Sequence, residues 1–206
     1  MGAVFARGGW RWSGRHSRLL ARLQDADGEE RGTMFEYALA LAFLLPLLFG
    51  VFSTARSQRI TVESKSLAED LVRMCRQGVD FSAPANRGIV LQLARGRGLS
   101  LGGGGGTVIL SRVHLVDGAD CRHCTNDGLA VFDRQIVIGD SAVAHGQTGT
   151  PPVDPETGLV RDPPNNPAAR AHITEEEVKP GPPVWICELW FPSPDQPGGI
   201  YARVAD

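Results

Sequence analysis

The chain has 206 residues, a length that suits one domain or two small ones. Its formal net charge of −2 argues against a general nucleic-acid-binding protein, which usually carries a strongly basic face, so we expect no nucleic-acid partner. The hydrophobic fraction of 42% is ordinary for a whole chain. Much of it is concentrated in one uninterrupted segment, so the remainder is moderately polar.

The first 32 residues are basic early and acidic late. Arg7, Arg11, Arg15, Arg18 and Arg22 precede Asp25, Asp27, Glu29 and Glu30, and Arg31 follows them. Positive residues before an apolar segment keep that side in the cytoplasm, although Arg56 and Arg59 beyond the segment make the asymmetry modest. We therefore predict a cytoplasmic leader over residues 1–32, disordered or forming a short amphipathic helix on the membrane surface. Everything after about Thr54 is predicted to be exported.

The apolar segment contains no charged side chain from Tyr37 to Phe52. A helix rises about 1.5 Å per residue, so roughly 20 residues cross a hydrocarbon core of ~30 Å. The stretch from Met34 to Thr54 has about that length. A buried helix of a soluble protein is the alternative, but soluble helices normally keep a polar stripe. The pattern predicts a transmembrane helix and a single-pass membrane protein.

Two residues interrupt this apolar pattern. Glu36 lies in the first turn of the helix, where burying a carboxylate costs several kcal/mol unless the group is paired or neutralised. The alternative is that Glu36 lies near the membrane surface and reaches water without a partner. Pro46 removes a backbone hydrogen bond, which transmembrane helices tolerate.

The order of Gly32, the pair Glu36-Tyr37 and a long apolar helix resembles the processing site of type IV prepilins. It is most similar to the TadE/TadG-like proteins of bacterial tight-adherence (Flp/Tad) pilus systems. The resemblance implies that a prepilin peptidase cuts after Gly32 and that Thr33 becomes the new amino terminus. It also implies that Glu36 is the assembly carboxylate, which pairs with the terminal amine of a neighbouring subunit. The family pattern has one residue more between the Gly and the Glu than is found here, so cleavage and an uncut anchor both stay open.

The helical pattern continues beyond the apolar segment. Apolar side chains recur at helical spacing at Leu67, Leu71, Met74 and Cys75, with charged residues on other faces. Gly78 is the expected stop, and Pro84 ends any continuation. We predict one helical region over residues 33–80, transmembrane in its lower half and amphipathic in its upper half.

Residues 81–206 are predicted to form a small exported β domain. The expected strands are Thr107–Val116, Leu129–Ile138, Val184–Phe191 and Ile200–Val204. Residues 87–93 are ambiguous between a strand and a helical turn. Residues 102–106 are all glycine and are predicted to be a flexible linker, because no Lys-Ser or Lys-Thr follows as in a phosphate-binding loop. The prediction is an α+β fold, in which the long N-terminal helix packs on a small antiparallel sheet.

Residues 140–183 are rich in proline and poor in apolar residues, which predicts a long surface loop or a disordered insertion. Three short strand segments around this loop are similar to patterns in the exported domains of the TadE/TadG-like group. They are Ser111-Arg112-Val113, Arg134 to Gly139 and Glu188 to Pro192. These loose patterns define no active site.

All four cysteines lie on the side predicted to be exported, where an oxidising compartment favours disulfides. Four cysteines allow three pairings. We favour a local Cys121–Cys124 bridge, with Cys75 on the helix joined to Cys187 on a strand. The alternatives are a redox-active Cys-x-x-Cys and a zinc site at Cys121, His123 and Cys124 completed by His114 or Cys187. We predict neither a metal nor a cofactor.

The leading hypothesis is a structural protein with no catalytic turnover, a pilin-like minor component or assembly factor of a bacterial pilus or secretion apparatus. The resemblance places it in the inner membrane, with its N-terminus in the cytoplasm and its C-terminal domain periplasmic or extracellular. The expected partners are other pilin-like subunits, the pilus assembly machinery, a prepilin peptidase and the lipid bilayer. One alternative is an uncut, membrane-anchored periplasmic binding or envelope-assembly module. Another is a tethered thiol oxidoreductase.

Overall fold

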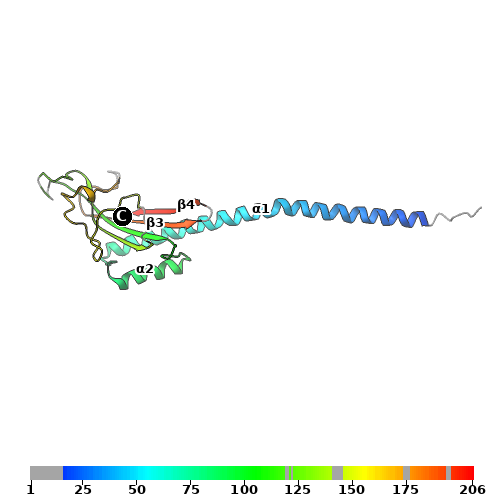
Figure 1. Ribbon diagram of the computed structural model, residues 1–206, viewed down its shortest axis with the longest axis horizontal. Helices are drawn as coiled ribbons and strands as arrows, with labels where there is room; N and C mark the ends of the chain where they lie inside the picture. The colour runs from blue at the N-terminus through cyan, green and yellow to red at the C-terminus, as the bar shows by residue number, and fades with distance from the viewer. Residues whose placement is uncertain (1–15, 119–120, 122, 141–145, 174–176, 194–195) are drawn as a thin grey trace, which may run out of the picture. The chain divides into compact units, whose positions relative to one another are not determined.

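The computed structural model of the protein describes residues 16–118, 121, 123–140, 146–173, 177–193 and 196–206 (Figure 1). The elements in chain order are α1 (His16–Arg76), α2 (Pro84–Gly96), β1 (Thr107–Leu115), β2 (Ala130–Gly139), the 3₁₀ turn η2 (Pro167–Ala169), β3 (Val184–Ser193) and β4 (Gln196–Ala205). The chain divides into two compact units, Met1–Phe52 and Ser53–Asp206. Each unit is described by itself.

Helix α1 begins earlier than predicted. It starts at His16, so Gly32 and Thr33 lie inside the helix and the predicted leader is helical from residue 16 onward. The reason is local, because residues 16–31 are rich in Leu, Ala, Arg and Glu, which are strong helix formers. The first 15 residues of the leader, including most of the predicted amphipathic segment, lie outside the described residues.

The end of α1 agrees with the prediction. The last helical residue is Arg76, and Gly78 takes a left-handed φ of +85°. The amide of Gly78 donates to the carbonyl of Cys75 and the amide of Val79 to that of Met74, each at 3.0 Å. These bonds satisfy carbonyls that the last helical turn leaves without partners, and glycine adopts the required φ without steric cost.

The four strands form one antiparallel sheet in the order β2-β1-β3-β4, which confirms the predicted α+β fold. Strands β1 and β3 pair in the centre, with Leu110 opposite Cys187. Strand β2 pairs with β1, and the register shifts between Arg112 and Val113, which leaves Asp133 as the extra residue of a β-bulge.

One face of the sheet is covered by α2 and by the part of α1 that follows Phe52 (Figure 1). Leu67 and Leu71 of α1 and Val90 of α2 are fully buried. They pack with inward-facing strand residues such as Leu110 and Leu189 in one core cluster. The amphipathic half of the predicted helix therefore packs on the sheet as expected.

The other face carries a second apolar cluster, built by β1, β2, β3 and the proline-rich segment. Of the two forms predicted for residues 140–183, the described residues 146–173 and Val178 fit the long loop: they are largely irregular and pack on the sheet. The amide of Gln135 donates to the carbonyl of Gly158 at 2.8 Å, so the segment pairs with the free edge of β2. Several of its apolar residues, among them Val160 and Ala169, are buried against the sheet, whereas Leu159 is 51% exposed.

The structure also decides two local questions, at residues 87–93 and 102–106. The ambiguous residues 87–93 lie within α2, and Pro84 occupies its first turn, where its missing amide hydrogen costs nothing. The glycine run is a hydrogen-bonded turn rather than a flexible linker, because the amide of Gly106 donates to the carbonyl of Ser100 at 2.7 Å. A Cβ atom at Gly106 would overlap the ring of Phe191, so the close approach of the two segments requires glycine there.

Candidate functional site: the apolar helix and the cysteine turn

The apolar segment of α1 exposes all of its large side chains. Met34 is 78% exposed, Phe43 69% and Phe52 71%. The region has a mean hydropathy of 2.2, and α1 is the one helix among the described residues that is long and apolar enough to cross a membrane. A patch of this size marks a membrane or protein interface. The helix lies near the N-terminus and fits a single-pass membrane protein.

Glu36 is the single acidic residue between Met34 and Val62. Its side chain is exposed, and it follows Met34 and Phe35, which are exposed as well. The backbone at Gly32 and Thr33 is helical, so the predicted processing site and the predicted assembly carboxylate belong to the same continuous helix. The segment thus presents one carboxylate at the start of an otherwise uncharged apolar surface.

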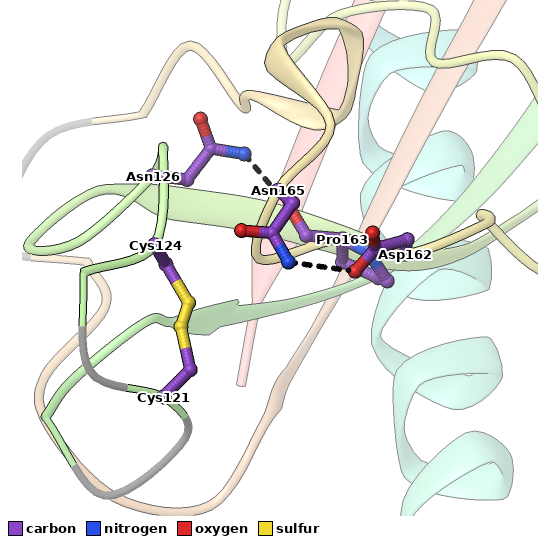
Figure 2. Close-up of a disulfide and its surroundings, with 6 residues drawn as sticks. All are labelled: Cys121, Cys124, Asn126, Asp162, Pro163 and Asn165. Atoms are coloured by element: carbon purple, nitrogen blue, oxygen red, sulfur yellow. Dashed lines mark hydrogen bonds between the residues drawn. A yellow bond between two sulfur atoms is a disulfide. The ribbon is translucent and has the colours of Figure 1, made fainter.

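The second candidate is the turn between β1 and β2, where Cys121 and Cys124 are joined in a disulfide (Figure 2). Their Cα atoms are 5.9 Å apart. His123 lies between them with a φ of +71°, an uncommon value for a residue other than glycine. Cys124 packs against the second apolar cluster. The bridge therefore closes a small loop whose base rests on the sheet.

A buried asparagine anchors this turn to the proline-rich segment. Asn126 is 0% exposed, and its Nδ2 donates to the carbonyl of Pro163 at 2.8 Å (Figure 2). The same Nδ2 also donates to the carbonyl of Asn166 at 2.7 Å. Its Oδ1 accepts from Nε of Arg170 at 2.8 Å. In the sequence, Asn126-Asp127-Gly128 is typical of a turn and indicates nothing more. No local signal reveals this role, because the partners lie 37 to 44 residues further along the chain.

The surroundings of the bridge suit a structural role better than thiol exchange. Reactive Cys-x-x-Cys pairs open a helix, whose N-terminus stabilises the thiolate, whereas this pair lies in a loop followed by turns. The zinc alternative is not assembled either. Among the described residues, no group of three or more ligating side chains could hold a metal. The two residues expected to complete the site lie elsewhere: Nδ1 of His114 is 2.8 Å from Asp133, and Cys187 belongs to the first core cluster.

Cys75 and Cys187 are free thiols, so the predicted bridge between the helix and the sheet is not formed. Both are buried in the same core cluster, where an unoxidised cysteine packs as a small apolar side chain. Burial raises the pKa of Cys75 to about 12, although Arg134 opposes this effect. Burial also raises the pKa of Cys187 well above its ordinary value, and the neighbouring Cys75 adds to the increase. Neither thiol is a good nucleophile near neutral pH.

Comparison with known proteins adds no relative. No protein-family model matches the chain, and no curated protein or solved structure matches it. Its function has to be argued from its own residues.

Proposed function

We propose that the protein is a pilin-like structural component or assembly factor of a bacterial pilus or secretion apparatus, of the TadE/TadG-like type. One observation carries the proposal: an apolar helical segment whose large side chains are all exposed and which bears a single carboxylate, Glu36, in its first turn. In this proposal α1 spans the inner membrane with the N-terminus in the cytoplasm. The unit Ser53–Asp206 is exported and displayed by the helix.

Glu36 is the residue that distinguishes this helix from a simple anchor. A carboxylate at this depth is stable only when paired, neutralised or drawn out to water. In the proposed mechanism the new terminal amine of Thr33 on a neighbouring subunit pairs with Glu36. Glu36 is the third residue after Thr33, so the pair would offset neighbouring helices by about 4.5 Å along their axes. The carboxylate then sets the register of lateral helix packing.

Removal of the leader has to occur within a helical stretch. Proteolysis requires a locally extended backbone, so the helix has to unwind around Gly32. Each glycine inside a helix costs about 1 kcal/mol relative to alanine, and Gly28 and Gly32 both lie in this part of α1. The glycines favour local opening at the predicted processing site.

Intact mass measurement of the full-length protein from membranes, with and without an active prepilin peptidase, tests the proposal. We expect a peptidase-dependent loss that corresponds to residues 1–32. Gly32→Leu should abolish the loss. Gly28→Leu, one helical turn upstream, should leave it intact and controls for effects on the helix itself. An unchanged mass of the wild-type protein would contradict processing.

An uncut membrane-anchored module is the second candidate. The observation that favours it is the spacing of three residues between Gly32 and Glu36, one fewer than in the family pattern. In this case Glu36 has no terminal amine to pair with, and the exported unit acts as a tethered binding or envelope-assembly domain. A tethered thiol oxidoreductase would need an accessible thiol of low pKa, whereas burial raises the pKa of both free thiols.

A further inference from the structure

A polar groove of about 560 Å³ lies within the unit Ser53–Asp206. It opens between the C-terminal end of α1 and strands β1, β2 and β3. The side chains that matter in it are Arg76, Asp80, Arg112, Arg134, Trp185 and Asp206. No step of the proposed assembly mechanism uses these residues.

Two arginines face each other in this groove. Arg112 on β1 and Arg134 on β2 are direct cross-strand partners, and Trp185 on β3 lies opposite Arg112 on the other side. Directly opposed residues of antiparallel strands project from the same face, and like charges so placed destabilise a sheet by roughly 0.2–1 kcal/mol. The Arg134–Asp80 ion pair offsets part of this repulsion, and a bound anion would offset the rest.

Two of the three arginines in the groove are already neutralised. Arg134 pairs with Asp80 at 3.0 Å, and Arg76 pairs with Asp206 at 2.9 Å. Hydrogen bonds from the backbone amide and then the hydroxyl of Ser82 hold the pKa of Asp80 below its ordinary value, so its carboxylate is charged at neutral pH. Arg112 is the least compensated of the three, because its ion pair with Asp133 is longer, at 3.8 Å.

Arg112 forms a weak ion pair with Asp133 in the part of the chain that the structure describes. Its Nε lies 3.8 Å from Oδ2 of Asp133, too far for a hydrogen bond, and the other oxygen of Asp133 lies 2.8 Å from His114. The Arg112 side chain is 46% exposed. Its guanidinium therefore presents a planar set of donors to the groove, a geometry that matches a carboxylate in a bidentate pair.

We propose that this groove binds an acidic segment of a partner polypeptide, with an Asp or Glu carboxylate held by Arg112 beside Arg134. The volume exceeds what one small anion fills and lies in the range of ligand sites. The apolar walls at Val79, Pro182, Pro183 and Trp185 suit the backbone and side-chain stems of a peptide. The proposal goes beyond the assembly role of α1 and does not depend on leader cleavage.

Titration calorimetry with the full-length protein in detergent tests the inference, using an amide-capped tetraglutamate peptide as the probe. We expect tetraglutamate to bind and the neutral isostere tetraglutamine to bind at least tenfold more weakly. Arg112→Gln should weaken tetraglutamate binding at least tenfold, and Arg112→Lys should weaken it less. Arg95→Gln, which removes an exposed arginine of α2 outside the groove, should have no effect.

Two results would overturn the proposal. One is equal binding of tetraglutamate by the wild type and Arg112→Gln, and the other is inorganic phosphate binding as tightly as tetraglutamate. Arg112 is half exposed, and its removal relieves a like-charge contact, so the variant should fold. As a second measurement that needs no variant, the NMR signal of the Arg112 Nε–H group in the wild type should shift on addition of tetraglutamate. A signal that stays in place would also count against the site.

Discussion

The backbone amide of Thr148 donates to Oε1 of Glu188, 3.0 Å away, and so fastens the proline-rich segment to the middle of strand β3. Glu188 is 1% exposed and accepts a second hydrogen bond from the hydroxyl of Tyr201 on β4. It projects from the face opposite the neighbouring residues Cys187 and Leu189, which point into the first core cluster. A single buried carboxylate thus links one loop and two strands.

Tyr201→Phe should destabilise the protein. The variant leaves a buried carboxylate without one of its donors, which costs about 1–3 kcal/mol. Urea unfolding followed by circular dichroism measures the change. Tyr37→Phe is the matched control, because Tyr37 is 72% exposed in the apolar segment, and it should be neutral. Equal stabilities of Tyr201→Phe and the wild type would contradict the role of this hydrogen bond.

Asn126→Ala should destabilise the cysteine turn and the segment that it anchors. The variant removes three hydrogen bonds and leaves the carbonyls of Pro163 and Asn166 without this donor, so a loss of about 3 kcal/mol or more is expected. Hydrogen exchange should rise in residues 161–171 before the sheet is affected. The control is Asn165→Ala, because its exposed amide makes one bond of 3.2 Å to Asp162 (Figure 2). A similar loss in both variants would argue against a special role for Asn126.

The sequence predicted the elements of the fold better than their tertiary connections. The strand of β-branched residues beginning at Thr107 and the helix stop at Gly78 are local features, set by side-chain alternation and by backbone freedom. The packing of residues 146–173 on the sheet does not follow from their local sequence. Scattered residues such as Val160 and Ala169 show no periodicity, and their burial depends on hydrogen bonds to an edge strand distant in the sequence.

The cysteines also show that a sequence predicts secondary structure better than tertiary contacts. The pattern placed Cys75 on the helix and Cys187 on a strand that packs against it, and both do lie in one core cluster. Sequence spacing cannot say whether two neighbouring thiols are oxidised, because bridging depends on the separation and direction of their Cβ atoms. The Cys121–Cys124 bridge was simpler to anticipate, since a separation of three residues in a turn brings the two side chains together.

The two free thiols should be unreactive until the protein unfolds. In the native state near neutral pH, the aromatic disulfide reagent DTNB should detect neither Cys75 nor Cys187, because both are buried and their thiolates are disfavoured. In denaturant without reductant it should detect these two, and after reduction all four cysteines. Rapid labelling of the native protein would contradict the burial of both thiols.

The raised pKa of Cys75 predicts that the protein loses stability in alkali. The pKa of Cys75 is raised from 9.0 in the unfolded chain to about 12 in the folded protein, so the folded state holds its proton more tightly between these values. Stability is therefore fully present below about pH 9 and falls as the pH rises toward 12, by roughly 1.4 kcal/mol per unit for one such thiol. Urea unfolding across this range should show a shallower decline in Cys75→Ala than in the wild type. Identical slopes would exclude the Cys75 thiol as the cause.

Glu36→Gln separates membrane anchoring from subunit assembly. The amide keeps the size of the side chain and removes its charge, so insertion of α1 should be at least as favourable as in the wild type. Loss of the charge pair in the low-dielectric membrane should weaken the association of subunits. We expect the amount of untagged subunit that co-purifies with a tagged subunit from membranes to fall at least tenfold. Glu69→Gln is the control on the same helix, because Glu69 is exposed within the unit Ser53–Asp206. If Glu36→Gln co-purifies as well as the wild type, Glu36 does not direct assembly, and the uncut anchor becomes the better account of this chain.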